Sequence, residues 1–532
     1  MARSLWFGAV VLATVLGAGP PAAAAAAPQP ATHGPVYYLD CGAQGPGDGS
    51  QSSPWTSLAQ VDATVFTPGS SLLVSRGTTC TGTLAPGGSG TAAAPITVSA
   101  YGTGPLPVID GGSNQEAVLL DNQQHWKITD LATTGGDRYG ILVEGDSSTP
   151  LVLSGITISD VVVRDVSGQA TTSTGKGSGL IYMAAGGEQK FHDVTVSRVL
   201  AYGTNQWGGI VLGAGEFPNH PGTDITVEDS IVHNVGGDGI LIGEADGARS
   251  TGNVAYDTGM IVTPTVASTI GTPSAIWDFN CHHCLVQGNV AFDSHSSNSD
   301  GGDYDIDTAS GYQTVVGNFG GPSDGYCGSI FSTYGITDPD STFAGNLCIG
   351  NGSNASLAWQ GAIFLSSWSS TPGCLDGVNV SGNTVYWDPS ASAPLLNTEA
   401  YPGGQAVFCG SSPDVFRGNT LIAQDPDFVL AGPPLALDHN TYVDGSGGTP
   451  EWSYDGTTYS NFSAYQSGSG QDGSSRFLDS PAGATPTSRS MAFAERLGAH
   501  AGPTTQPVHA NAGVAWRQAL DRSLLALGYG YK

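Results

Sequence analysis

The dipeptide Gly-Asn recurs along the middle of this chain, each time just after a short apolar alternation, and this repeat limits the folds that the chain can adopt. Successive pairs lie 36, 29, 28, 37 and 36 residues apart, and His439-Asn440 is a candidate continuation. Short apolar segments such as SAIWDFN and GAIFLSS lie between the pairs, and similar segments such as YGILVEG and DGILIGE precede the first pair. The asparagines of the six pairs are Asn253, Asn289, Asn318, Asn346, Asn383 and Asn419.

Each repeat unit holds two or three short strands of period two, and a unit of this size cannot bury its apolar face alone. Stacking the units as coils of parallel strands solves this problem, and the uneven spacing argues against a propeller, which needs even blades. No helix of useful length can be read between residues 97 and 445. We therefore predict an all-β parallel solenoid with an internal asparagine ladder at one corner, because Asn tolerates left-handed backbone and its amide can bond to stacked neighbours.

The composition suits strands and turns and disfavours some partners. The chain has 78 glycines among 532 residues, and only 11% of its residues are charged. Lys and Arg number 16 against 45 Asp and Glu, so the formal net charge is −29 at pH 7. A protein this acidic repels nucleic acid and anionic membrane surfaces, so we predict no nucleic-acid partner and favour a neutral ligand.

The N-terminus has the pattern of a secretory signal peptide, which we assign to residues 1–27. A single basic residue, Arg3, precedes an apolar run over residues 5–16, and cleavage is expected between Ala23 and Ala27. A membrane anchor is the alternative, but the run is shorter than the ~20 residues that span a bilayer. We predict a secreted, extracellular protein with no membrane association after cleavage.

Eight cysteines in an exported chain predict disulfides, because the compartment is oxidising. Cys41 and Cys80 both fall in the N-terminal segment and are expected to pair. The group NCHHC, Cys281 to Cys284, resembles half of a zinc site, but no second CxxC or HxxxH lies near it, so we predict no metal site there. Its two cysteines form either a short local bridge or bonds to Cys327 or Cys348.

Two segments of the chain carry recognisable motifs. The N-terminal one contains PWTSL, PGSSLLVSRG and AYGTGPLPVID, and the other reads IWDFNCHHCLVQGNVAFDSHSSNSDGGDYDIDTASGYQTVVGNF. Over about residues 36–445 the chain resembles the secreted bacterial right-handed parallel β-helix proteins of the pectate-lyase-like superfamily. The resemblance implies a right-handed parallel β-helix of about ten coils, with an N-terminal cap, a C-terminal extension and a carbohydrate partner. The resemblance says little about which reaction the chain catalyses, because this superfamily includes lyases, hydrolases, epimerases and adhesins.

The resemblance also sets the expected domain boundaries. Residues 36–115 would form the N-terminal cap and first coils, residues 116–445 the β-helix domain that binds or cleaves a glycan, and residues 446–532 a capping region with short helices after Ser490. No subfamily can be assigned. The Asn-Thr-Asp and Gly-Asp-Asp motifs of polygalacturonase-type hydrolases are absent in that form, and the chain has only four lysines to serve as the base of a pectate lyase.

The stretch SDGGDYDIDTASG, residues 299–311, concentrates aspartates in a chain that is poor in charge. Alternate side chains of a strand share a face, so Asp303, Asp305 and Asp307 are expected on the outer face and the apolar residues between them inside. Two such carboxyls lie about 6.6–7 Å apart along a strand, close to the separations found in carboxyl pairs that cleave glycosidic bonds.

Alignment of the coils on the Gly-Asn pairs adds a fourth carboxyl. Asp278 lies eleven residues before Asn289, and Asp307 lies eleven before Asn318, so the two aspartates are expected to stack on adjacent rungs about 4.8 Å apart. Crowded carboxylates cannot all ionise cheaply, so one of them keeps a proton and can act as a general acid. The predicted catalytic residues are Asp305, Asp307, Asp278 and Asp303.

Two other interpretations of this stretch stay open. A standard calcium loop would need Gly and Glu where Thr308 and Thr314 stand, so we predict that no cofactor is required and keep a nonstandard calcium site as an alternative. Solvated turn charge is the other interpretation, and it suits Asp300 best because two glycines follow it.

Residues around the acidic strand are candidates for substrate binding. A histidine in the preceding loop and a glutamate after an outer strand could contact substrate, and three aromatic residues beside strands could stack on a sugar ring. Each has an ordinary alternative, because loop histidines are often solvated and aromatic rings are often buried. Trp277 aligns with Ile306 and is expected in the core. The candidates are His295, Glu244, Trp207, Tyr326 and Trp368.

These features together predict a secreted carbohydrate-active enzyme that cleaves an extracellular polysaccharide, most simply a glycoside hydrolase that uses the clustered aspartates. A polysaccharide lyase is the alternative enzyme, and its base would be a residue such as Lys176, His295 or Arg249. A noncatalytic glycan-binding or adhesin-like solenoid is the alternative outside enzymes.

Overall fold

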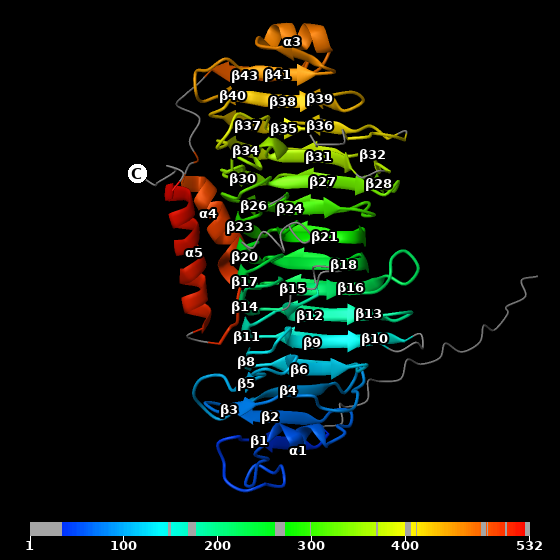
Figure 1. Cartoon of the computed structure of the whole chain (residues 1–532), viewed down its shortest axis with the longest axis vertical. Coiled ribbons are helices and arrows are strands. Elements are labelled where there is room, and N and C mark those ends of the chain that lie inside the picture. Colours follow the sequence, from blue (N-terminus) through cyan, green and yellow to red (C-terminus); the bar gives the residue numbers. More distant parts are fainter. Residues whose placement is uncertain are drawn as a thin grey trace, which may run out of the picture.

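The computed structural model in Figure 1 describes eleven stretches of the chain: residues 34–146, 151–168, 177–260, 272–297, 299–368, 371–398, 406–410, 412–479, 486, 488–505 and 508–526. Short strands make up most of this part of the chain and stack along one long axis (Figure 1). Nearly all the strand pairs are parallel and join consecutive coils. The expectation of an all-β fold with long parallel sheets is confirmed.

The strands form three stacks that run along this axis. The front and side stacks join, with β42 (Thr457–Tyr459), into one 27-stranded sheet, and the back stack is a 14-stranded sheet. The front stack contains β6 (Glu116–Asp121), β9 (Tyr139–Gly145), β12 (Gly179–Ala185), β15 (Gly208–Gly213), β18 (Ile240–Asp246), β21 (Ser274–His282), β24 (Gly302–Asp307), β27 (Gly328–Thr333), β31 (Ile363–Trp368), β35 (Leu396–Asn397), β38 (Asp427–Ala431) and β41 (Glu451–Tyr454).

The other two stacks complete each coil. The side stack contains β1 (Val36–Leu39), β2 (Ser71–Ser75), β4 (Ile96–Tyr101), β7 (Trp126–Thr129), β10 (Val152–Ser159), β13 (Lys190–Ser197), β16 (Gly222–Glu228), β19 (Arg249–Thr251), β22 (Leu285–Gln287), β25 (Thr314–Val316), β29 (Thr342–Ala344), β33 (Asn379–Ser381), β36 (Val415–Arg417) and β39 (Ala436–Asp438). The back stack contains β3 (Thr79–Thr81), β5 (Val108–Asp110), β8 (Ala132–Thr134), β11 (Val162–Val166), β14 (Leu200–Thr204), β17 (Ile231–Val235), β20 (Val254–Thr258), β23 (Val290–Ser294), β26 (Phe319–Gly320), β30 (Leu347–Ile349), β34 (Thr384–Trp387), β37 (Thr420–Ala423), β40 (Thr441–Asp444) and β43 (Arg476–Asp479). A separate pair, β28 (Thr337–Pro339) and β32 (Cys374–Asp376), lies outside the three stacks.

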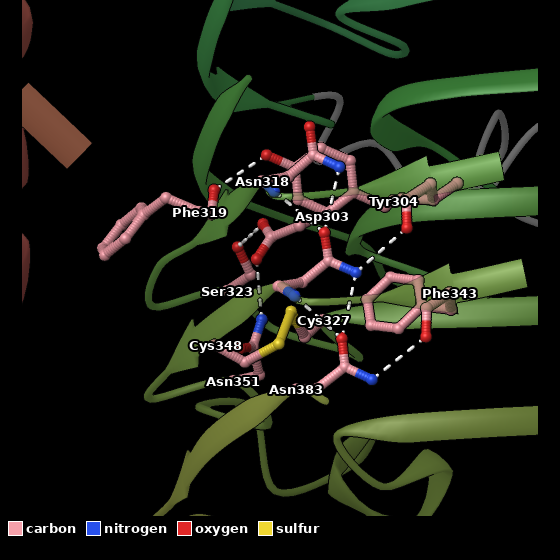
Figure 2. The surroundings of a disulfide bond; sticks show 12 residues. Asp303, Tyr304, Asn318, Phe319, Ser323, Cys327, Phe343, Cys348, Asn351 and Asn383 are labelled. Atoms are coloured by element: carbon pink, nitrogen blue, oxygen red, sulfur yellow. Dashed lines mark hydrogen bonds between the residues drawn. A yellow bond between two sulfur atoms is a disulfide. The ribbon is translucent and has the colours of Figure 1, made fainter. Parts of the chain in front are cut away.

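The predicted asparagine ladder is present at the corner between the side and back stacks. The main-chain N–H of each asparagine donates to the side-chain oxygen of the asparagine in the next coil, at 2.9 to 3.0 Å. Asn440 ends the series as expected, and His439 takes the place of glycine with a φ of 58°. The six glycines have φ between 61° and 67°, a backbone conformation that most side chains disfavour. Figure 2 shows Asn318 and Asn383 within this ladder.

The disulfides agree with the expectations that the sequence allowed. Cys41 pairs with Cys80, and Cys281 with Cys284, which confirms the N-terminal pair and the local bridge. Cys327 and Cys348 bond to each other instead of to the NCHHC group (Figure 2). A fourth bridge joins Cys374 to Cys409.

Helices lie at the ends and along one flank of the solenoid (Figure 1). The helices α1 (Leu58–Asp62) and α3 (Phe462–Ser469) are at opposite ends. The predicted late helices are present as α4 (Ser488–Leu497) and α5 (Val508–Ala526), and short 3-10 turns occur at η1 (Ala358–Gln360) and η3 (Gly498–His500). The helix α5 packs Trp516 and Leu520 against Tyr256 and Phe292 of the back stack. The described residues after 446 thus cover the end and the back of the solenoid, and the domain boundaries stay predictions.

The outer face of the front stack is the face that no helix covers within the described part of the chain (Figure 1). None of the described helices is both long enough and apolar enough to cross a membrane. Residues 1–27, assigned to the signal peptide, lie outside the described residues.

The ladder predicts a large cost for losing one asparagine. Asn318→Ala would remove the acceptor of the Asn289 main-chain N–H and the donor to the Val286 carbonyl. Each buried group left unpaired costs roughly 1–3 kcal/mol, so we expect the melting temperature in thermal denaturation to fall by several degrees. Asn114→Ala, at an exposed asparagine, is the control and should leave the melting temperature unchanged. Equal melting temperatures for the two variants would contradict the structural role of the ladder.

Candidate functional site

The register of β24 against β21 decides where the acidic stretch points. Asp305 lies opposite Trp277, and Asp307 lies opposite Phe279. Both aspartates point to the outer face of the front stack, while Ile306 between them is fully buried in the core. The expectation of an outward Asp305 and Asp307 is therefore confirmed.

Asp278 does not share that face, which corrects the prediction of a stack with Asp307. It lies opposite Ile306 and points into the interior of the solenoid, where it is 1% exposed. Paired residues of β21 and β24 are 28 positions apart in the sequence, whereas paired residues of the following side strands β22 and β25 are 29 apart. The turn after β24 therefore contains one residue more than the turn after β21, and this extra residue is the cause. A one-residue slip moves a side chain to the opposite face of a strand. For the same reason Trp277 lies on the outer side of the strand beside Asp305, and not inside the solenoid as expected. It is nevertheless buried there, in a small apolar cluster with Val211 and Leu241.

Asp303 is also inside, which corrects the expectation that it lies on the outer face. The register pairs Gly302 with Ser274 and Tyr304 with Ile276. Both Asp303 and Tyr304 are fully buried, so the alternation of faces is interrupted at the start of β24.

The contacts of Asp303 confirm its inward position. Its carboxylate accepts hydrogen bonds from Ser323 at 2.6 Å and from Asn351 at 2.8 Å, beside the disulfide of Cys327 and Cys348 (Figure 2). Burial raises the pKa of Asp303 well above its usual range, and the hydrogen bonds from Ser323 and Asn351 oppose this rise.

Asp305 is held on the outer face by hydroxyl groups from the neighbouring coil. Its carboxylate accepts hydrogen bonds from Ser329, directly opposite on β27, and from the Tyr326 hydroxyl at 3.2 Å. Ser274 lies 3.2 Å from the same tyrosine hydroxyl. Asp305 is only 3% exposed, so these hydroxyls replace most of the water that a surface carboxylate would have.

A buried polar chain continues from this group toward earlier coils. The Ser274 main-chain N–H donates to Asp238 at 3.2 Å, and the Trp207 indole N–H donates to the other oxygen of Asp238 at 3.0 Å. Two predicted binding residues, Trp207 and Tyr326, therefore connect to Asp305 through Asp238 and Ser274. Both aromatic residues are almost fully buried, so their positions suit support of the site better than stacking on a sugar.

The electrostatic surroundings of Asp305 favour its neutral form. Burial raises its pKa well above the usual range, and the charges of Asp307 and Asp300 raise it further, while Ser329 and Tyr326 lower it. Burial and neighbouring negative charge both favour the protonated form of a carboxyl. Asp307 is partly exposed at the end of the strand and accepts hydrogen bonds from the Thr308 N–H and hydroxyl at 2.6 and 2.9 Å. The two outward carboxyls therefore sit in different environments.

Aromatic side chains surround this carboxyl pair. Phe364 lies opposite Ser329 on the next strand and packs edge-to-face on Phe331 at 5.3 Å and on Trp359 at 5.6 Å. Trp277 and Phe279 lie on the other side of β24, with ring centroids 5.9 Å apart. Phe364, Phe331 and Trp277 are almost fully buried, so these rings pack around the carboxyl pair and help to exclude water from Asp305.

Three predicted binding residues lie away from Asp305 or outside the described side chains. His295 follows β23, and its ring nitrogen is 3.5 Å from Asp324; the hydrogen bond to Asp324 raises the pKa of His295. Glu244 accepts hydrogen bonds from Asn280 at 2.7 Å and from the Phe217 N–H, so it joins a loop to β21. Trp368 ends β31, and its side chain lies outside what the structure describes.

Asp278 forms a separate group in the interior. Its Oδ2 accepts a hydrogen bond from the Gln313 amide at 2.9 Å, whereas Asp278 Oδ1 and Gln313 Oε1 have no hydrogen-bond partner among the described residues. A proton on Oδ1 accounts for both oxygens, because the acid would then donate to Gln313 while the amide donates back. Burial raises the pKa of Asp278 to about 8, in agreement with this pairing.

Asp278 also belongs to the one group of three metal-ligating side chains found among the described residues, together with Cys281 and Cys284. The two cysteines are bonded to each other, so they offer no thiolate to a metal while the disulfide is intact. The calcium alternative at the acidic strand stays untested.

Several residues of the site were not predicted from the sequence. Asp238 stands in GGDGILIG, just before an outer strand, and an acidic residue at that place was a usable signal. Ser274 and Ser329 gave no signal, because serines are frequent in this chain and only the coil register shows which of them meets Asp305.

No protein-family model matches the chain, and no curated protein matches it. Among solved structures, the GH136 lacto-N-biosidase from Eubacterium ramulus superposes with a TM-score of 0.54 at 16% identity, covering 71% of this chain and 67% of that one. An alginate lyase from a Paenibacillus species gives a TM-score of 0.39 at 17% identity, covering 58% and 94%. A mannuronan C-5 epimerase module from Azotobacter vinelandii gives 0.41 at 12% identity, covering 80% and 93%. The likeness to the biosidase shows a shared fold.

The interior acid predicts a pH-dependent stability. Because the pKa of Asp278 is raised by folding, its contribution is complete near pH 4 and is lost as the pH rises through about 8, by roughly 5 kcal/mol in total. Asp278→Asn can keep the reciprocal pair with Gln313, since its amide donates where the acid O–H did. We expect equal melting temperatures for wild type and variant at pH 4.5 and a higher one for the variant at pH 8.5.

Asp193→Asn, at an exposed aspartate, is the matched control and should follow the wild type at both pH values. A wild-type protein whose stability is flat between pH 4.5 and 8.5 would show that Asp278 is ionised throughout.

Proposed function

We propose that this chain is a secreted carbohydrate-active enzyme, a glycoside hydrolase that cleaves an extracellular polysaccharide on the outer face of the front stack. The observation that carries the proposal is the pair of outward carboxyls in contrasting environments. Asp305 is buried, bonded to two hydroxyls and surrounded by negative charge, whereas Asp307, two residues further along the same strand, is partly exposed. Pairs of carboxyls whose environments differ in this way divide the acid and base roles.

The chemistry assigned to the pair follows from these environments. Asp305 keeps a proton at neutral pH and acts as the general acid, protonating the glycosidic oxygen as its bond to the anomeric carbon breaks. Asp307 acts on the opposite side of the scissile bond, either by attacking the anomeric carbon or by taking a proton from the attacking water. Two residues along a strand span about 6.6–7 Å, which is within the range that leaves room for an attacking water beside the sugar.

The hydrolase is preferred over a lyase because a lyase needs a base to remove a proton from the sugar. No basic side chain contacts Asp305 within the described part of the chain. Arg249 lies in β19 of the side stack, and His295 follows β23 of the back stack and is paired with Asp324. Lys176 lies outside the described residues. A lyase and a noncatalytic glycan-binding solenoid stay the alternatives.

The comparisons support a carbohydrate substrate in general terms. A lacto-N-biosidase, by its name a glycoside hydrolase, shares the fold, and the other similar structures reported above are named as an alginate lyase and a mannuronan epimerase. The net charge of −29 favours a neutral polysaccharide over a polyanion.

The carboxyl pair is tested by replacing each member with its amide. Asp305→Asn and Asp307→Asn should each lower turnover at least ~100-fold, since general acid or base catalysis supplies about that much. The melting temperature should hold or rise in Asp305→Asn, because the variant removes a buried acid. Release of reducing ends from a panel of soluble polysaccharides is the measurement, and Asp193→Asn is the control. Full activity in both variants would exclude these residues from catalysis.

The same panel separates the alternatives. We expect new reducing ends without new ultraviolet absorbance, because hydrolysis forms no unsaturated sugar, and we expect a chelator to leave activity and melting temperature unchanged. Ultraviolet absorbance that grows during digestion would identify a lyase instead. A chelator that lowers the melting temperature would identify a structural calcium ion, since a ligand bound only by the folded state stabilises it.

A further inference from the structure

A row of aromatic side chains leaves the carboxyl pair and reaches the corner between the front and side stacks. We define the edge row as Phe279 and His282, which are on β21, His283 in the turn that follows, and Tyr312 in the equivalent turn of the next coil. The His283 and Tyr312 rings are stacked at 5.0 Å with 8° between their planes, and His282 meets Tyr312 edge-on at 6.0 Å. Tyr312 is 44% exposed, and the His283 side chain is 60% exposed.

The coil register places the edge row directly beside the proposed catalytic strand. Phe279 lies opposite Asp307 on β24. Further along the same pair of coils, His282 bridges to Gly311, the residue before Tyr312. The edge row therefore begins at Asp307 and runs along the strand direction, across the long axis of the solenoid.

Neighbouring residues hold the edge row in place. A side chain at Gly243 would meet the Phe279 ring at 2.2 Å, so this glycine lets the ring lie flat on the preceding strand. His283 is 2.8 Å from Asp246, and the His282 ring packs against Phe217 at 4.4 Å. His283 and Tyr312 both have a φ of 55°, a left-handed backbone conformation that residues at many turns of this solenoid share.

On the outer face of the front stack, the described positions aligned with Phe279 and Trp277 on the preceding strands offer no comparable exposed row. On the two preceding front strands, the outward residues aligned with Phe279 are Gly243 and Gly213. The column of Trp277 continues into Leu241 and Val211, which are almost fully buried. Exposed rings are therefore found on the transverse path from Asp307 to the corner.

We propose that the edge row is a glycan-binding subsite that holds pyranose units of a neutral polysaccharide next to the carboxyl pair. This inference rests on the proposed function and adds the direction of the bound chain, along β21 and β24 toward the corner. Flat aromatic faces match the apolar C–H faces of a sugar ring, and the polar ends of His283 and Tyr312, with Asp246, are placed to bond its hydroxyls. Exposed apolar clusters of this kind mark interaction sites on soluble proteins.

The experiment measures binding separately from cleavage. Affinity gel electrophoresis of the full mature protein would use a soluble β-glucan, a galactomannan and an arabinogalactan as neutral probes, and polygalacturonate as the acidic probe. Each measurement is repeated in the Asp305→Asn background, so that binding is read without turnover. We expect retardation by at least one neutral probe and a dissociation constant about tenfold higher in Tyr312→Ala, as expected for the loss of one stacking ring.

Two variants serve as controls for Tyr312→Ala. Tyr312→Phe keeps the ring and should bind within about twofold of wild type. Tyr38→Ala removes a partly exposed tyrosine of β1, far from the edge row, and should not change binding. Tyr312→Ala and Tyr312→Phe should stay within a few degrees of the wild-type melting temperature, because Tyr312 is 44% exposed.

The outcomes separate this inference from the proposed function. Unchanged binding in Tyr312→Ala would overturn the edge row, whatever happens to cleavage. Retardation by polygalacturonate alone would overturn the neutral ligand. Weaker binding in Tyr312→Ala together with undiminished cleavage in Asp305→Asn would keep the edge row and reject the catalytic assignment of Asp305.

Discussion

The hydrogen-bonded register between successive coils is the constraint on which every other placement in this molecule depends. The asparagine ladder sets the start of each coil at one corner, because a main-chain N–H reaches the amide oxygen of the next coil only when the two asparagines are aligned. From that corner the chain returns to the front stack through turns whose lengths differ by single residues. The ladder and the turn lengths therefore both determine which side chains of a front strand face inward. Counting residues from the ladder gives the correct face only in coils whose turns have the same length.

Several carboxyl groups are buried, and their surroundings give them different roles. Asp278 and Asp303 lie inside, where an amide or small polar groups bond to them, and neither faces solvent. Asp305 is almost as buried but lies on the outer face, and its pKa is raised by neighbouring acids as well as by burial. Burial alone favours the protonated form of a carboxyl. The acid role that we propose also requires an outward position beside a partly exposed partner, which is Asp307.

The sequence was sufficient for the fold and for part of the site. The Gly-Asn repeat predicted the parallel coils and the ladder, and its spacing even located Asn440, because these features depend on one residue type at one corner. The faces of Asp278 and Trp277 were predicted wrongly, since a single additional residue in the turn after β24 changes the register of the front stack without changing the repeat. Asp303 was wrong for a different reason, because two successive residues point inward where the chain enters β24. Contacts such as Ser329 to Asp305 lie between coils, and no pattern within one coil reports them.

The two faces of the front strands also differ in how freely their residues vary. Inward positions on successive strands are Ile240, Ile276 and Tyr304, all buried in one continuous core. The adjacent outward positions are Leu241, Trp277, Asp305, Ser329 and Phe364, five different side chains at one place in the coil. An inward change must fit neighbours above and below in one continuous core, whereas the outward residues pack in smaller, separate clusters. A solenoid of this kind can therefore carry a functional site on the outward residues of two or three coils, and we propose that here those are the coils in which Asp305, Asp307 and the edge row come together.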